Sequence, residues 1–208
     1  LTLFERNIIF NKEKISEQLN LLISKKDQLN KENKILIDLI IAEFSVFTGD
    51  FLQALNLSNL HSDAEENTIR LNAYRYKTLA EFSLGMSSAG ESAGKALRIA
   101  EDSFGKDSPE ILPYILMILT TTIEDSPKVA TQGLRIIYEN GLENTEIAAQ
   151  LWVAQGEEAF KIGNYEDAEV YYNRALEIYD KAVVLTNPVM YNIALLGMAK
   201  TVLLQKEY

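Results

Sequence analysis

The segment AQLWVAQGEEAFKIGNYEDAEVYYNRAL, residues 149–176, decides the fold of this chain. Apolar residues recur at helical spacing on both sides of Gly163-Asn164, which predicts two helices joined by a tight turn. Small residues stand where two such helices would cross closely, and Trp152, Tyr165 and Tyr172 would fill the space around them. The segment therefore predicts an antiparallel helical hairpin. Its small positions are Gly156, Ala159, Ala168 and Ala175.

The same residues resemble the tetratricopeptide repeat (TPR). The resemblance implies an all-α fold, a right-handed α-solenoid of antiparallel helix hairpins with about ten helices. It also implies that residues 1–208 form a single TPR-like solenoid. The matching tryptophan, glycine, tyrosine and small-residue positions are Trp152, Gly156, Ala159, Tyr165, Ala168 and Ala175.

A second segment repeats this signal without the tryptophan. Gly49-Asp50-Phe51 corresponds to Gly163-Asn164-Tyr165. Ala54 follows Phe51 by three residues, as Ala168 follows Tyr165. Glycine can adopt the left-handed conformation that ends a helix, and Asp or Asn can cap the next one. We therefore expect clear repeats at 31–60 and 149–184, a truncated one at 188–208, and divergent ones within 62–140.

Prolines and small residues set the other expected boundaries. Ser108-Pro109, Ser126-Pro127 and Asn187-Pro188 each place a capping side chain before a proline suited to the first helical position. Pro113 should kink its helix or delay its start. The small, polar residues 87–94 predict a loose turn. Residues 104–110 resemble the linker of kinesin-light-chain-like TPRs, whose second helices are longer.

The first two expected helices, from Asn11 to about Leu29 and from Lys31 to Thr48, allow an alternative. They could form one long coiled coil, although the polar residues Lys26 and Asn33 at its heptad positions disfavour that. In the first of these helices, the expected inward face consists of Ile15, Leu19, Leu22 and Ile23.

Composition and charge exclude several classes of protein. The chain has no cysteine, which excludes a disulfide scaffold, a thiolate zinc site and a cysteine nucleophile. No apolar run approaches the roughly 18 residues of a membrane span, so we expect no membrane insertion. The net charge is −10, and bases do not cluster, so nucleic-acid binding is disfavoured. We expect a cytoplasmic location, with a periplasmic or secreted one left open, and a bacterial source because Asn, Lys and Ile are abundant.

Acidic residues concentrate between Glu139 and Asp180. This stretch holds ten acidic residues against Lys161 and Arg174, a net charge of −8. Such a surface attracts a basic partner. The alternative interpretation is a solvated helical face without a ligand.

The chain contains no catalytic or metal-binding motif that we can identify. Its single histidine, His61, falls in a predicted loop, and no glycine-framed serine accompanies it. Glu157-Glu158 or the group Glu166, Asp167 and Glu169 could hold a metal, but Glu166 and Asp167 are more simply favourable charges at a helix N-terminus. We therefore expect no enzyme, no catalytic residues, no metal and no cofactor.

The TPR resemblance implies that the first helices of successive repeats line a groove that receives a peptide or a partner helix. Glu157 stands where chaperone-binding TPRs have an amide or a base, so we expect a basic peptide with apolar anchors. The expected function is a non-enzymatic protein–protein interaction module or scaffold; the alternative is a ligand- or peptide-sensing regulatory TPR domain of a larger bacterial signalling or transcription-regulating protein. The implied groove residues are Gln150, Val153, Ala154, Glu157, Phe160, Lys161, Ile193, Leu196, Gly197, Lys200 and Leu204.

Both ends of the chain also suggest contacts beyond it. The chain begins with Leu1, and residues 206–208 match the turn before a second helix, which we interpret as a solenoid that continues in a longer protein. Solenoid ends with exposed apolar faces often pair. We therefore expect a homodimer through Leu1–Leu22 or through the C-terminal end.

Overall fold

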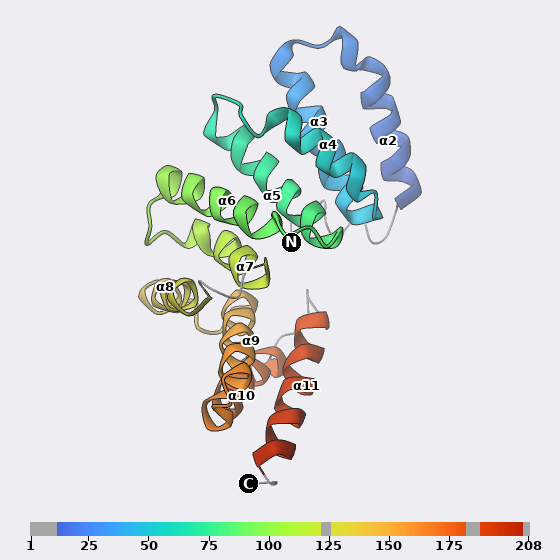
Figure 1. Cartoon of the computed structure of the whole chain (residues 1–208). Coiled ribbons are helices and arrows are strands. Elements are labelled where there is room, and N and C mark those ends of the chain that lie inside the picture. The colour runs from blue at the N-terminus through green and yellow to red at the C-terminus, as the bar shows by residue number, and fades with distance from the viewer. Residues whose placement is uncertain (1–11, 122–125, 182–187, 206–208) are drawn as a thin grey trace. The chain divides into compact units, whose positions relative to one another are not determined.

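The computed structural model describes residues 12–121, 126–181 and 188–205 (Figure 1). The chain divides into two compact units, Leu1–Ser103 and Phe104–Tyr208, and each is described by itself. Over the described residues all regular structure is helical, with ten α-helices and two short 3-10 helices. The all-α class and the number of helices are therefore confirmed. The single domain over 1–208 and the handedness of the solenoid stay predictions.

The first unit is built on the hairpin of α3 and α4, with α5 packed against both helices. Its core consists of Leu39 and Ala42 from α3 and Ile69, Ala73 and Tyr76 from α5. The elements of this unit are α2 (Lys12–Lys25), η1 (Lys26–Gln28), α3 (Lys31–Thr48), α4 (Phe51–His61), α5 (Asn67–Ser83) and α6 (Ala89–Phe104).

The N-terminal helices are separate, so the coiled-coil alternative is wrong. After η1 the backbone of Leu29 is extended, and Asn30 caps α3 by accepting a hydrogen bond from the backbone N–H of Asn33 at 2.9 Å. Helix α2 packs on α3 through Ile15 and Leu19, which contact Ile40, Ile41 and Phe44. The two other residues of its expected inward face, Leu22 and Ile23, are exposed.

Helix α6 begins earlier than the sequence predicts. The small, polar residues 87–94 predict a loose turn, but α6 starts at Ala89, so Gly90 and Gly94 lie inside it. Its alanines at 89, 93, 96 and 100 are buried. Two side-chain contacts join it to α5: Asn67 Nδ2 donates to Ser103 Oγ at 3.3 Å, and Lys95 Nζ lies 5.8 Å from the Tyr74 ring. Tertiary packing therefore outweighs the low helix propensity of the two glycines.

The turns of the two clear hairpins match the prediction. Gly49 and Gly163 both adopt the left-handed conformation, with φ of 86° and 78°. Asp50 then caps α4 by accepting from the N–H of Gln53 at 3.1 Å, and Asn164 Oδ1 accepts from the N–H of Asp167 at 3.3 Å. The glycine ends one helix and the next residue begins the following one, as expected.

In the second unit, α10 packs against both α9 and α11, and α9 also contacts α11 (Figure 1, orange to red). Helices α7 and α8, which precede α9 in the chain, also pack against it. The elements of this unit are η2 (Pro109–Ile111), α7 (Leu112–Thr121), α8 (Ser126–Glu139), α9 (Glu146–Lys161), α10 (Tyr165–Lys181) and α11 (Pro188–Gln205).

The structure confirms the prediction for Pro113 but not the helix cap predicted at Ser108. Pro113 delays its helix as predicted, because a 3-10 turn precedes α7, which begins at Leu112. Ser108 does not cap the backbone; its hydroxyl donates to Glu110 instead. The expected cap at Asn187 lies outside the described residues.

The small residues of the deciding segment lie where the helices cross. Tyr172 of α10 is fully buried, and a Cβ added to Gly156 of α9 would stand 2.7 Å from its ring. Ala159, Ala168 and Ala175 are buried as well. The expectation that Trp152 is also a core residue needs correction. Trp152 is half-buried and stacks on Tyr171, with ring centroids 5.6 Å apart.

Candidate functional site

The first candidate site is the surface that α9 and α11 form in the second unit. On α11, Ala194, Gly197 and Thr201 are buried, and the Thr201 hydroxyl donates to the Gly197 carbonyl at 2.8 Å. Tyr191, on one flank of this buried face, points to α10. Its hydroxyl donates to Asp180 at 3.4 Å and its ring meets the Tyr179 ring edge-on.

Three predicted groove residues lie on the opposite flank of α11. Ile193, Leu196 and Lys200 are spaced at helical intervals and therefore share one side of the helix, away from Tyr191 and α10. Ile193 is 36% exposed and Leu196 is 56% exposed. These apolar side chains are therefore available to a ligand in the described part of the chain. Of the neighbouring predicted residues, Gly197 is buried against Tyr172 and Leu204 is half-buried.

The predicted groove residues of α9 are only partly accessible. Gln150, Ala154 and Glu157 are half-buried and share one face of the helix. Val153 is 1% exposed, so its side chain belongs to the core and offers no surface to a ligand. This placement corrects the expectation for Val153, which the helix-face pattern of the TPR family had put in the groove.

At the C-terminal end of α9, the two remaining predicted residues behave differently. Lys161 is exposed, whereas the ring of Phe160 is half-buried and packs on Tyr165 with centroids 5.6 Å apart. The ring of Phe160 therefore helps to pack the turn between α9 and α10, and only part of it is open to a ligand.

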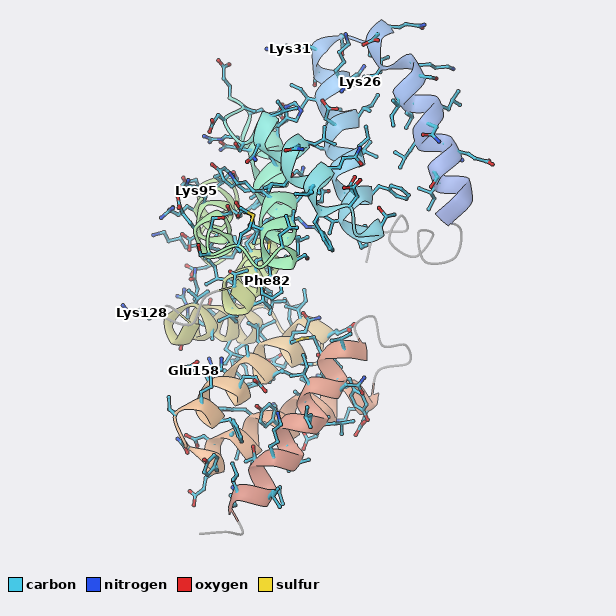
Figure 2. All side chains as sticks on the ribbon, turned by 45° about the vertical axis from the view of Figure 1, so that its right-hand side comes forward. Lys26, Lys31, Phe82, Lys95, Lys128 and Glu158 are labelled. Atoms are coloured by element: carbon cyan, nitrogen blue, oxygen red, sulfur yellow. The ribbon has the colours of Figure 1, made fainter. Side chains whose placement is uncertain are left out.

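Glu157 links this surface to the packing of the unit. The Tyr172 hydroxyl donates to Glu157 Oε1 at 2.7 Å. Burial, together with the hydrogen bond to Glu157 and its charge, raises the pKa of Tyr172 far above its ordinary value, so the hydroxyl stays a donor even in alkali that would ionise an exposed tyrosine. Tyr172 thus holds the carboxylate of Glu157 in one orientation at the edge of the surface. Glu158 is half-buried as well, but it points to another side of α9, away from α11 (Figure 2).

The second candidate site lies in the first unit and centres on Asp38. Asp38 of α3 is 7% exposed, accepts a hydrogen bond from Lys26 Nζ of η1, and lies 3.2 Å from His61 Nε2 of α4. The sequence predicts a loop at His61, but this residue is the last one of α4 and is largely buried. The sequence could not indicate this contact, because the two residues stand 23 positions apart and only the fold brings them together.

A hollow of about 800 Å³ opens beside Asp38 (Lys26 and Lys31 are labelled in Figure 2). Lysines of η1 and α3 and carboxylates, mainly from the loop before α5, line the same space over an apolar floor. Such a lining suits a ligand that carries charges of both signs. The residues are Lys26, Lys31, Glu32, Lys34, Ile35, Asp38, Leu60, His61, Asp63, Ala64, Glu65, Glu66 and Ile69.

The acidic groups singled out in the sequence do not assemble a metal site among the described residues. Glu166 and Asp167 lie in the first turn of α10, where negative charge is favourable. Within the described ranges, no group of three or more His, Asp or Glu residues is placed to hold a metal ion. In the same ranges, no helix is long and apolar enough to cross a membrane.

The fold and these two surfaces define an all-α protein of packed helical hairpins. Comparison with models of known protein families gives no match, and comparison with curated proteins gives none either.

Proposed function

We propose that this chain is a non-enzymatic protein–protein interaction module of the TPR type, which binds a peptide or a partner protein on its α9–α11 surface. One observation carries the proposal. Ile193 and Leu196 are exposed on α11, while Glu157 lies on the neighbouring helix α9. Apolar anchors would bury against the two α11 residues, and a basic side chain would pair with the carboxylate of Glu157.

The acidic character of the surrounding stretch supports a basic partner. Ten acidic residues against two basic ones between Glu139 and Asp180 create a negative potential that accelerates the approach of a positively charged ligand. Salt screens such long-range attraction, so the proposed binding weakens as ionic strength rises.

A capture experiment with matched variants tests this proposal. The chain is immobilised and exposed to a lysate, and bound proteins are compared for the wild type, Leu196→Asp and Leu52→Asp. Leu52 lies on α4 of the first unit and is 65% exposed, so it controls for adding a charge at an exposed leucine. We expect the wild type and Leu52→Asp to retain a protein that Leu196→Asp loses. Circular dichroism should show that the wild type and both variants are equally helical. Retention by all three would contradict the assigned surface.

A second candidate function, a ligand- or peptide-sensing regulatory domain, is favoured by the hollow beside Asp38. Its volume is in the range of small-molecule sites, and its lining offers both charges and an apolar floor. Thermal unfolding with free arginine, free glutamate and a dipeptide tests it. We expect one of them to raise the Tm of the wild type but not of Lys34→Ala. Lys25→Ala, an exposed lysine outside the hollow, is the control.

A further inference from the structure

The hollow beside Asp38 contains charges of opposite sign that do not pair with one another. Lys31 and Lys34 lie in the first turn of α3, whereas Asp63, Glu65 and Glu66 lie in the loop between α4 and α5. All five residues line the same space, yet among the described residues no ion pair joins either lysine to one of these carboxylates across it. The two groups of charges are therefore too far apart for direct contact.

Three other residues of the lining, Asp38, Lys26 and His61, already satisfy one another. One carboxylate oxygen of Asp38 accepts a hydrogen bond from Lys26 Nζ, and the other, Oδ2, lies 3.2 Å from His61 Nε2. These side chains come from η1, α3 and the end of α4, so their contacts hold the walls of the hollow in place. The charges that remain for a ligand are those of α3 and of the loop before α5.

The α3 side of the hollow favours an anionic group. Lys31 and Lys34 stand at the N-terminus of α3, where the helix dipole already favours negative charge. Glu32 is the acidic residue of this turn, so two positive charges stand against one negative charge. A carboxylate on this side would be stabilised by the lysines and by the helix N-terminus together.

The loop side of the hollow favours a cationic group. Asp63, Glu65 and Glu66 are exposed, and the loop from Ser62 to Glu66 contains no basic residue. Glu66 directly precedes α5, but its side chain makes no capping hydrogen bond there. Three carboxylates are thus available to an ammonium group.

An apolar floor lies between the two charged sides. Ile69 of α5 belongs to the core of the first unit, and Ile35 of α3 and Ala64 of the loop pack against that core. Leu60 of α4 also lines the hollow and is 71% exposed, so it can cover an apolar group bound there. The middle part of a ligand that spans the hollow should therefore be apolar.

These features select a ligand with separated charges. In a free amino acid the ammonium and carboxylate groups share one carbon atom, so they cannot reach two groups of charges that are themselves too far apart to pair. Each additional residue of an extended peptide separates the two ends by about 3.5 Å more. The hollow, with a volume of about 800 Å³, has room for a few residues.

We propose that the hollow beside Asp38 binds a short peptide by its two free ends. The C-terminal carboxylate of the peptide contacts the lysines of α3, the N-terminal ammonium group contacts the carboxylates of the loop before α5, and an apolar side chain packs on the floor between them. This inference rests on the second proposed function, a ligand- or peptide-sensing domain, and names its ligand.

Isothermal titration calorimetry with an Ala-Leu-Ala tripeptide and its end-blocked forms tests the two end contacts. We expect N-acetylation and C-amidation each to weaken binding to the wild type about tenfold, because each removes one charge-assisted contact. Free leucine should bind about tenfold more weakly than the tripeptide as well. Equal affinities for the free and the end-blocked peptides overturn the proposal.

Two double variants assign each end of the peptide to one side of the hollow. Lys31→Gln/Lys34→Gln should weaken binding of the free tripeptide but not of the C-amidated form. Glu65→Gln/Glu66→Gln should weaken binding of the free tripeptide but not of the N-acetylated form. If each variant weakens the free and the corresponding end-blocked peptide by the same factor, the assigned contacts do not exist and the proposal fails.

Matched controls carry the same change of charge outside the hollow. Lys25→Gln/Lys106→Gln removes two exposed lysines, and Glu17→Gln/Asp27→Asn removes two exposed carboxylates. Both controls should bind all three peptides as the wild type does, and circular dichroism should show that every variant is folded. A loss of affinity in the controls equal to that in the hollow variants would reveal a general effect of charge and overturn the assignment.

The failure of this proposal is distinguishable from that of the sensing function. If free arginine or free glutamate raises the Tm of the wild type while Ala-Leu-Ala does not bind, the hollow is a ligand site but the peptide assignment is overturned. If none of these molecules, the tripeptide included, binds to the wild type, both proposals fail.

Discussion

The ring of Tyr172 occupies the space in which a side chain on Gly197 would have to stand. A Cβ added to Gly197 would lie 2.4 Å from Tyr172 Cζ, closer than real Cβ atoms approach other heavy atoms. Gly156 faces the same ring from α9 at 2.7 Å. One buried tyrosine thus sets the spacing of three helices, because α10 can approach α9 and α11 only where both lack a side chain.

Enlarging either glycine should separate the helices. We expect Gly197→Ala and Gly156→Ala each to lower the free energy of unfolding by about 1–3 kcal/mol through overpacking. Urea unfolding followed by circular dichroism measures the loss. Combining Gly197→Ala with Tyr172→Leu should restore part of the stability relative to Tyr172→Leu alone. Strictly additive effects would contradict the direct contact.

Removing the Tyr172 hydroxyl separates its hydrogen bond from its packing. Tyr172→Phe keeps the ring between the two glycines but deprives Glu157 of its donor at 2.7 Å. We expect a loss of about 0.5–1.5 kcal/mol in the free energy of unfolding, the usual net contribution of a hydrogen bond. An unchanged stability together with unchanged partner capture would mean that the hydroxyl does not orient Glu157 usefully.

The raised pKa of Tyr172 and that of Tyr179 predict a loss of stability in alkali. Burial is the main cause for both tyrosines, so the folded chain keeps their protons while the unfolded chain releases them above its ordinary tyrosine pKa, near pH 10. The free energy of unfolding should therefore be constant with respect to these groups below about pH 9 and fall above about pH 10. Denaturant unfolding across this range should show a shallower fall for Tyr172→Phe than for the wild type.

Tyr172 should contribute more to the stability of the fold than Trp152, although the side chain of Trp152 is larger. Tyr172 is fully buried, so Tyr172→Ala should cost about 3–5 kcal/mol. Trp152 is half-buried and stacks on Tyr171, so Trp152→Ala should cost less, about 1–3 kcal/mol. Equilibrium unfolding of the two variants compares them directly, and a larger loss for Trp152→Ala would contradict the observed burial.

Asp38 should stabilise the first unit through its two partners. Asp38→Asn keeps the shape of the side chain but removes the charge that Lys26 and His61 contact, and we expect a loss of about 1–3 kcal/mol. Asp63→Asn is the matched control, because Asp63 lines the same hollow but is exposed. Unfolding monitored by circular dichroism should leave this control within about 0.5 kcal/mol of the wild type. Equal losses for the two variants would contradict a role for the buried contacts.

Features that act within one turn of the chain could be read from the sequence alone. Gly163 and Asn164 end one helix and cap the next through bonds to residues at most five positions away, and the same holds for Gly49 and Asp50. The delayed start at Pro113 depends only on the geometry of its ring. The helical hairpins and the all-α class follow from such local chemistry and from apolar periodicity, so the sequence by itself determined them.

Features that depend on which neighbours cover a residue were decided by the tertiary structure. Val153 and Glu157 lie one helical turn apart, yet Val153 is in the core and Glu157 is half-buried at the surface, because the helices packed on α9 cover one of these side chains and not the other. His61 joins Asp38 across 23 residues, and Tyr172 rather than Trp152 fills the crossing of α9, α10 and α11. Burial is a property of the assembled helices. Periodicity tells which faces of a helix are apolar, but only packing decides which of them are covered and which, like the side of α11 that carries Ile193 and Leu196, are left exposed.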